Sequence, residues 1–259
     1  MKELSVGFVG GGRVVGILLE GWKRAQKIPA SIIVSDCNAD SLKKLKSRFP
    51  QVQVVAGKPG LAAGQDVVFL AVHPPVMAEV ATGLRGIIGA DSIVVSLAPK
   101  FTIAKLTELL GGFSRVARVI PNAPSSVNFG FNPVCFSPAL ASADRANLTS
   151  LLEPLGECPE VAEAKLEAYA LLTGMGPTYL WFQFQALREL AVSFGLSETE
   201  TAAALKRMVC GSARTLLESG LSSAEVMDLV PVKPLADMEA PILEAYRTKL
   251  PGLFQKIKP

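Results

Sequence analysis

The sequence predicts an α/β fold with a doubly wound parallel sheet in its N-terminal part and an all-α domain in its C-terminal part. Over residues 1–161, apolar runs typical of buried parallel strands alternate with segments of helical periodicity. Over residues 162–259 the strand-like runs cease and long helical periodicity replaces them. We therefore expect two domains with these bounds, an α/β domain followed by an all-helical one.

The chain opens with the pattern of a strand, a glycine turn and a helix. An apolar run over residues 6–9 leads into the glycines at 10–12, and residues 14–22 have the apolar spacing of a helix. Backbone N–H groups at a helix N-terminus favour a bound diphosphate. A glycine turn without a ligand is the alternative, but the placement between a buried strand and an amphipathic helix favours nucleotide binding.

The glycine spacing matches two of the three small positions of the Rossmann dinucleotide-binding fingerprint. Gly10 would make the tight turn, and Gly12 would let a diphosphate approach the backbone closely. The third position is Val15, whose branched side chain departs from the pattern. We therefore expect a Rossmann-type domain that binds NAD or NADP.

The second expected strand ends in Asp36, about 20 residues after the glycines, where the fingerprint places an acidic residue. Its carboxylate can accept both ribose hydroxyls of adenosine and would repel a 2′-phosphate, which favours NAD over NADP. Arg13, Lys43 and Lys44 can offset a phosphate charge, so the preference stays open. Asp36 can instead be a solvated residue that opens a turn, with Asn38 as a helix cap.

Five strands are expected after the first, and their carboxyl ends should meet at one edge of the sheet. They cover residues 31–36, 52–55, 65–72, 92–98 and 115–120. Ligands of doubly wound sheets bind outside this edge, so the loops that follow the strands should complete the cofactor site. The expected cofactor-binding residues are Gly10, Gly11, Gly12, Arg13, Val14, Asp36, Ala71, Val72, His73, Pro74, Ala98 and Asn122.

His73 is the only histidine of the chain and follows the strand over residues 65–72. Because no Asp, Glu or Cys stands at ligand spacing from it, we expect no metal site. Its remaining roles stay open: contact with the cofactor, a direct part in catalysis, or filling the loop beside two prolines.

The overall composition excludes several classes of protein. The net charge is +3 with scattered Lys and Arg, so no nucleic-acid or membrane partner is expected. Apolar runs stay shorter than the ~18 residues of a membrane span. The first strand begins close to Met1, and the four cysteines lack paired spacing, so we expect neither a leader nor a disulfide framework, and a cytoplasmic setting.

The second half predicts helices over residues 163–173, 177–194 and 197–219. Pro177 suits a first turn, and Ser197 with Glu200 forms a capping box. These helices carry more apolar surface than a small appendage can bury, which predicts a homodimer or higher homo-oligomer through this half. The apolar residues concerned are Leu171, Leu172, Leu180, Trp181, Phe184, Leu187 and Leu190.

Several sequence blocks, in one order, resemble the pyrroline-5-carboxylate reductases. They are VGFVGGGRVVGILLEG, FLAVHPPVM, SLAPK, RVIPNAPSSVNFG and LLTGMGPTYLWFQFQAL, followed by GLSETET and GSARTLLESG. The likeness covers roughly residues 4–230. It implies a Rossmann domain with an all-α dimerisation domain, and reduction of a small cyclic imine to proline with NADPH or NADH.

The resemblance also implies which residues position the substrate. Thr173 stands where the family has a serine and keeps the hydroxyl, and Asn122 would lie near the nicotinamide. Gly174 and Gly176 precede a helix and can offer N–H groups to a substrate carboxylate. The expected substrate-positioning residues are therefore Thr173, Gly176 and Asn122, with no single general acid.

The substrate half departs from the family more than the cofactor half. The family's SPGGTT segment has no counterpart in residues 227–250, and Met175 replaces a small polar residue. His73 replaces a lysine and Gln185 a glutamate. Loss of a hydroxyl donor would leave a charged imine partly unpaired in a dry pocket.

Other functions stay open for this reason. The chain can reduce a different imine, or it can be a catalytically altered nucleotide-binding dimer that acts as a sensor or scaffold. A 3-hydroxyacid dehydrogenase is disfavoured, because residues 177–181 carry no lysine at the position where that class has a catalytic one.

Overall fold

The computed structural model describes residues 4–259 and contains two compact units. The first unit extends to Met175 and also includes residues 253–259, and the second covers residues 176–252. Residues 1–3, which bear on the prediction that no leader precedes the first strand, lie outside the described part. Among the described residues, no helix is both long and apolar enough to cross a membrane.

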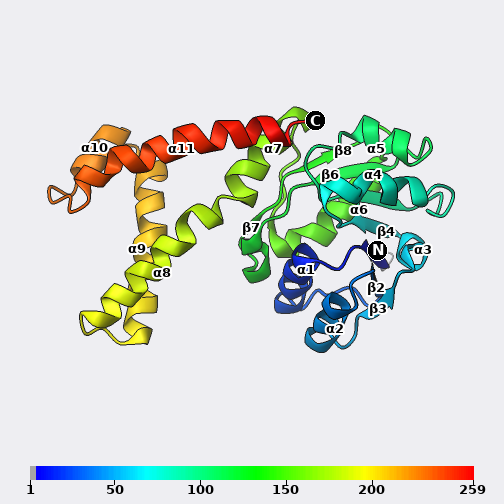
Figure 1. The fold of residues 1–259 in the computed structure, drawn as a ribbon, viewed down its shortest axis with the longest axis horizontal. Coiled ribbons are helices and arrows are strands. Elements are labelled where there is room, and N and C mark those ends of the chain that lie inside the picture. The colour runs from blue at the N-terminus through cyan, green and yellow to red at the C-terminus, as the bar shows by residue number, and fades with distance from the viewer. Residues whose placement is uncertain (1–3) are drawn as a thin grey trace. The chain divides into compact units, whose positions relative to one another are not determined.

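The first unit is built on a seven-stranded sheet with the strand order β3-β2-β1-β4-β5-β6-β8 (Figure 1). The strands are β1 (Val6–Val9), β2 (Ile32–Asp36), β3 (Gln53–Ala56), β4 (Val67–Leu70), β5 (Ile93–Ser96), β6 (Val116–Val119) and β8 (Val134–Phe136). The six strands β1 to β6 are parallel, and the order reverses between β1 and β4. This arrangement confirms the predicted Rossmann-type sheet.

The sheet also has an antiparallel edge strand that the sequence did not predict. β8 pairs antiparallel with β6, and a second small sheet joins β7 (Gly130–Phe131) to β9 (Gly156–Glu157). The segment between β6 and β8 holds the 3₁₀ turn η1 (Ala123–Val127) and β7 but no α-helical crossover, and the chain returns in the opposite direction. Strands of two or three residues give no readable periodicity, and for that reason the sequence did not predict them.

Helices cover both faces of the sheet and bury two separate apolar clusters. They are α1 (Arg13–Arg24), α2 (Ala39–Arg48), α3 (Pro59–Ala63), α4 (Pro74–Gly83), α5 (Ile103–Leu109) and α6 (Ser142–Leu152). Successive residues of β4 alternate between the clusters: Phe69 stacks on Phe8 with ring centroids 4.9 Å apart, whereas Val68 packs in the other cluster. The alternation shows that β4 is buried on both faces of the sheet.

The segment after the sheet is a broken helix, whereas the sequence predicted a continuous helix over residues 163–173. It consists of the 3₁₀ turn η3 (Glu163–Lys165), α7 (Leu166–Tyr169) and the π-helical turn η4 (Ala170–Gly174). Leu166 and Ala170 are buried in the core of the first unit. Because of this packing the compact units divide after Met175, and the predicted domain boundary at residue 161 stays a prediction.

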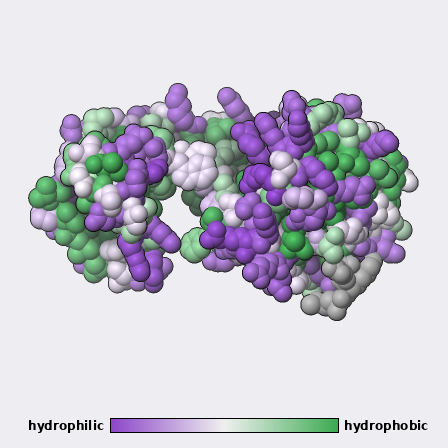
Figure 2. All heavy atoms as spheres, turned by 90° about the horizontal axis from the view of Figure 1, so that it is seen from below, coloured by the Kyte–Doolittle hydropathy of each residue, from purple (hydrophilic) through white to green (hydrophobic). Residues whose placement is uncertain are grey.

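The second unit is entirely helical. It contains α8 (Pro177–Ser193), α9 (Glu198–Glu218), α10 (Ser223–Asp228) and most of α11 (Ala236–Ile257). Ser197 caps α9 in a complete capping box with Glu200, as predicted, and Pro177 occupies the first turn of α8. Many large apolar side chains of this unit are exposed, and Figure 2 shows apolar residues gathered on its surface at the left of the view.

Candidate functional site

The glycine turn between β1 and α1 forms the floor of the candidate site. Gly10 has a φ of +104°, and a Cβ built on it would lie 2.5 Å from the carbonyl oxygen of Ala71. Both the backbone conformation and the close approach of the neighbouring chain therefore require glycine. The contact places the turn directly beside the loop that follows β4.

Gly12 is a different case, because neither its conformation nor its packing within residues 4–259 requires glycine. Its φ of −75° suits any residue, and a Cβ built on it would have no neighbouring atom within 4 Å. Gly12 is also the N-cap of α1 and makes no side-chain cap hydrogen bond. The first N–H groups of α1 thus face an open space that a diphosphate can approach.

A cavity of about 640 Å³ lies over this turn. Its lining residues are Gly11, Gly12, Arg13, Gly16, Ile17, Glu20, Ser41, Lys44, Leu45, Arg48, His73 and Ser126. Arg48 pairs with Glu20 at 2.9 Å, and Arg13 stands at the start of α1. With Lys44, the cationic lining residues outnumber Glu20, the one acidic residue in the described part of the lining, which suits a phosphorylated ligand.

Asp36 lies at the end of β2, beside the glycine turn. Its Oδ2 accepts the N–H of Gly11 at 2.5 Å, and its Oδ1 accepts the N–H of Asn38 at 2.7 Å. Asn38 in turn caps α2 by accepting the N–H of Ser41 at 3.0 Å. The carboxylate therefore holds the turn and the loop after β2 together, and its contact with a ribose stays a prediction.

The loops after β4 and β5 meet at the same edge of the sheet. The N–H of Ala71 donates to Val9 at 2.8 Å, and that of Leu97 donates to Leu70 at 3.2 Å. His73 is the exposed N-cap residue of α4 and lines the cavity, whereas Ala98 is buried. The structure thus brings the predicted positions 71–74 and 98 to the carboxyl edge of the sheet.

Asn122 organises the loop after β6. Its side-chain oxygen accepts the N–H of Phe131 at 3.2 Å and the hydroxyl of Ser125 at 3.3 Å, and its own N–H donates to Asn132 Oδ1 at 3.3 Å. These bonds give Asn122 a structural role that the sequence did not predict. Its place near the nicotinamide stays a prediction.

Thr173 and Gly174 end the π-helical turn η4. The Thr173 hydroxyl donates to the carbonyl oxygen of Tyr169 at 2.9 Å. A Cβ built on Gly174 would lie 3.7 Å from Ile120 Cγ2 and 4.0 Å from the Pro121 carbonyl oxygen. The turn therefore lies at the carboxyl end of β6, within the first unit. Gly176, the third predicted substrate residue, is the N-cap of α8 and begins the second unit.

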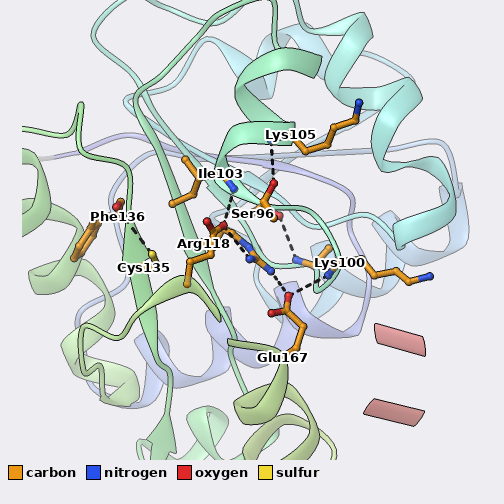
Figure 3. Close-up of polar contacts among 11 residues, drawn as sticks. Ser96, Lys100, Ile103, Lys105, Arg118, Cys135, Phe136 and Glu167 are labelled. Atoms are coloured by element: carbon orange, nitrogen blue, oxygen red, sulfur yellow. Dashed lines mark hydrogen bonds and ion pairs between the residues drawn. The ribbon is translucent and has the colours of Figure 1, made fainter. Parts of the chain in front are cut away.

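A buried ion-pair cluster also adjoins this edge, and the sequence analysis missed it. Arg118 of β6 is fully buried and pairs with Glu163 at 3.0 Å and with Glu167 at 2.5 Å (Figure 3). An arginine inside the apolar run RVARVI, and two glutamates one helical turn apart, are the signals that could have revealed it.

Two protein-family models match the chain. Residues 5–100 match the model described as NADP oxidoreductase coenzyme F420-dependent, and residues 163–234 match pyrroline-5-carboxylate reductase dimerisation. The pyrroline-5-carboxylate reductase of Escherichia coli K12 is 27% identical over 88% of this chain and 85% of its own length. The pyrroline-5-carboxylate reductase of Corynebacterium melassecola is 28% identical over 97% of this chain and 94% of its own length.

Solved structures give the same result. A pyrroline-5-carboxylate reductase from Coxiella burnetii is 27% identical, covers 99% of this chain and 95% of its own, and superposes with a TM-score of 0.70. The pyrroline carboxylate reductase of Plasmodium falciparum with NADP bound covers 99% of this chain and 96% of its own chain, with a TM-score of 0.79. At 18% identity the second likeness shows the fold alone.

Proposed function

We propose, from the premise that this chain belongs to the pyrroline-5-carboxylate reductase family, that it reduces a small cyclic imine of the pyrroline-5-carboxylate type with NADPH or NADH. The cofactor-binding edge and the similarity to reductases over nearly the whole chain support this activity. Proline would be the product if pyrroline-5-carboxylate itself is the substrate.

Gly12 is the observation that carries the proposal. A residue that is free of backbone strain and packing gains nothing structural from being glycine, since most side chains fit in open space. The absence of a side chain is useful there only if a ligand occupies that space. The uncapped N-terminus of α1 and the cations of the cavity support an anionic ligand, and the diphosphate of a dinucleotide fits this description.

Different residues of the first unit would bind different parts of the dinucleotide. The N–H groups at residues 12–14 and the Arg13 side chain would bind the diphosphate, and Asp36 the adenosine ribose. The loops at 71–74 and at 98 would hold the nicotinamide half. When bound, the reduced dinucleotide supplies the hydride for the imine carbon.

The substrate would be positioned, not activated covalently. Thr173 and the N–H groups of Gly174 and Gly176 would orient the imine and its carboxylate, with Asn122 fixing the adjoining loop. Holding two planar groups face to face and excluding water accounts for most of what such a reduction requires of a protein.

The proposal includes a homodimer, or a higher homo-oligomer, through the helices of the second unit. Trp181 and Phe182 of α8 are 51% and 69% exposed, and Phe194, which follows α8, is 79% exposed. Apolar patches of this extent mark association surfaces. The match of residues 163–234 to a dimerisation model supports the same assembly.

A cytoplasmic setting also belongs to the proposal, supported by four free thiols.

The test is oxidation of NADPH and of NADH by the purified protein with pyrroline-5-carboxylate, and in parallel with larger cyclic imines, followed by identification of the product amine. Glu79→Gln, an exposed change on α4 away from the glycine turn, serves as the control variant. Turnover of pyrroline-5-carboxylate supports the proposal. Turnover of larger imines alone would assign a different substrate, and binding of NADPH without turnover of any imine would assign a sensor or scaffold.

A further inference from the structure

The cluster around Arg118 links two segments that are expected to hold different reactants. Glu163 Oε1 accepts the N–H of Ile103 at 2.6 Å in addition to Arg118 Nη1. Glu167 Oε1 accepts the N–H of Lys100 at 3.3 Å in addition to Arg118 Nη2. Glu167 therefore joins the strand β6 to the loop that follows β5 (Figure 3), and Glu163 joins the same strand to the first residue of α5.

The loop after β5, residues 97–102, depends on these contacts for its shape. Lys100 has a φ of +78°, a left-handed conformation that is unfavourable for a residue other than glycine. Glu167 fixes the N–H of this residue, and Ser96 Oγ accepts the N–H of Ala98 at 3.4 Å. Ala98, at the start of the loop, is one of the expected contacts of the nicotinamide half.

The second segment, residues 163–175, carries the two glutamates. Near its end lies the turn at Thr173–Gly174, here called the substrate turn because these residues are proposed to position the imine. Glu167 lies in α7, directly before the π-helical turn that contains Thr173 and Gly174. π-Helical turns often occur at functional sites. Arg118 itself lies two residues before Ile120, beside which Gly174 packs. One guanidinium thus fixes the cofactor loop and the substrate turn to the same strand.

Stability alone does not account for this cluster. Arg118 is fully buried and Glu167 is 3% exposed, so both ions lost their hydration when the chain folded. Arg118 Nε also lacks a hydrogen-bond partner among the described residues. Apolar side chains of similar volume often stabilise such a position as well or better. A guanidinium that bridges two carboxylates through its two Nη atoms adds defined geometry between the elements it joins.

We propose that Arg118, through Glu163 and Glu167, is a positioning residue that sets the spacing between the loop at 97–102 and the turn at Thr173–Gly174. None of the three side chains needs to touch the cofactor or the imine. This inference rests on the proposed function for its consequence in catalysis, and it also predicts an effect on the bound dinucleotide that needs no turnover.

The test compares Glu167→Gln with Asp144→Asn. Glutamine keeps the shape of Glu167 and removes its charge. Asp144 pairs with Arg115 at 3.0 Å in a half-buried ion pair just before β6, away from both segments. Both variants remove one ion pair at strand β6, so a general loss of stability affects both. Arg118→Lys, which retains a cation, is measured beside them in case Glu167→Gln fails to fold.

Three quantities are measured on each folded variant: the Kd for NADPH, the fluorescence of the bound nicotinamide without imine, and kcat with its deuterium isotope effect from NADPH labelled at C4. For Glu167→Gln we expect a Kd within about threefold of the original, because the diphosphate and adenosine sites are intact. We expect an altered nicotinamide fluorescence, a kcat lower by about ten- to a hundredfold, and a larger isotope effect as hydride transfer becomes limiting. Arg118→Lys should be intermediate, and Asp144→Asn should match the original.

The inference is overturned if Glu167→Gln or Arg118→Lys lowers thermal stability but leaves fluorescence, kcat and isotope effect like those of Asp144→Asn. If the original protein turns over no imine, the proposed function fails. The fluorescence comparison then decides the inference alone: a change confined to the Arg118 and Glu167 variants supports it, and no change overturns it.

Discussion

Arg118 Nη2 on β6 donates to Glu167 Oε1 on α7, and neither side chain is more than 3% exposed. Replacement of Arg118 by methionine would leave the Glu167 carboxylate buried without its cation. We expect Arg118→Met to lower the free energy of unfolding by about 3–5 kcal/mol, measured by urea denaturation. Asp144→Asn should cost no more than about 1 kcal/mol, because its ion pair is partly exposed. Equal losses in the two variants would contradict the assignment of a tightly coupled buried pair.

Substitution of Gly12 distinguishes an effect on protein stability from an effect on ligand binding. Gly12→Asp introduces a good N-cap residue into open space, so we expect stability to change by less than about 1 kcal/mol. The new charge should repel the diphosphate and weaken NADPH binding by about a hundredfold or more. Thermal melting and fluorescence titration measure the two effects.

Gly10→Ala is the matched comparison for Gly12→Asp. A Cβ at position 10 would collide with the Ala71 carbonyl oxygen in a left-handed conformation, so this variant should lose stability first. If Gly12→Asp binds NADPH as tightly as the original protein, the diphosphate does not bind at the glycine turn.

Asp36 is expected to influence the choice between the two dinucleotides. Asp36→Asn removes the charge that opposes a 2′-phosphate and keeps an oxygen for the N–H of Gly11. We expect the ratio of the Kd for NADH to that for NADPH to rise by about five- to tenfold. Lys44→Ala, which removes a cation lining the cavity, should change the ratio in the opposite direction. Equal weakening of both dinucleotides by Asp36→Asn would mean that the carboxylate only holds the turn.

The sheet could be predicted because the sequence patterns that indicate it are contiguous in the chain and several residues long. The parallel strands are continuous apolar runs, the glycine turn has a fixed spacing, and Ser197 and Asn38 are caps with a known pattern. The antiparallel strand β8 was not predictable in this way, since three residues carry no periodicity. The compact units divide after Met175 because Leu166 and Ala170 pack in the core of the first unit, a tertiary contact without a sequence pattern.

The site was predictable where position along the chain determines position in space. The residues that follow β1, β2, β4 and β5 meet at one edge because parallel strands all end there. The hydrogen bonds of Asp36 to Gly11, and of Asn122 to Phe131, depend on side-chain direction, which the sequence does not encode locally. The pairing of Arg118 with residues more than forty positions later lies outside any local pattern for the same reason.

The four thiols should differ in reactivity. Burial raises the pKa of the Cys158 thiol from its ordinary value of 9.0 to about 11; a hydrogen bond with Asn132 opposes this shift, and Glu153 adds to it slightly. Cys37 and Cys210 are exposed. At pH 8 we expect iodoacetamide to label Cys158 about a hundredfold more slowly than the exposed pair. Saturating NADPH should slow labelling of Cys37, which lies beside Asp36, but not of Cys210.

The raised pKa of Cys158 also predicts a loss of stability in alkali. Because the folded protein holds the thiol proton more tightly than the unfolded chain, this contribution is complete below pH 9 and disappears as the pH rises through about 11. We expect the free energy of unfolding to fall by roughly 1–3 kcal/mol over this interval. Cys158→Ala should show a shallower decline, and an identical decline in both proteins would assign it to other groups.

Phe182 tests the proposed assembly without disturbing the protomer. Its side chain is 69% exposed on α8, so replacement by glutamate removes little packing within the unit, whereas burial of the new charge in an apolar interface is costly. Light scattering after size exclusion at micromolar concentration should give twice the mass of one chain, or a higher multiple, for the original protein and a lower mass for Phe182→Glu. Thr82→Glu, at an exposed position of α4 in the first unit, should assemble like the original. An original protein that is monomeric throughout the micromolar range excludes a stable dimer, and an unchanged mass in Phe182→Glu would move the interface to another face of the helical unit.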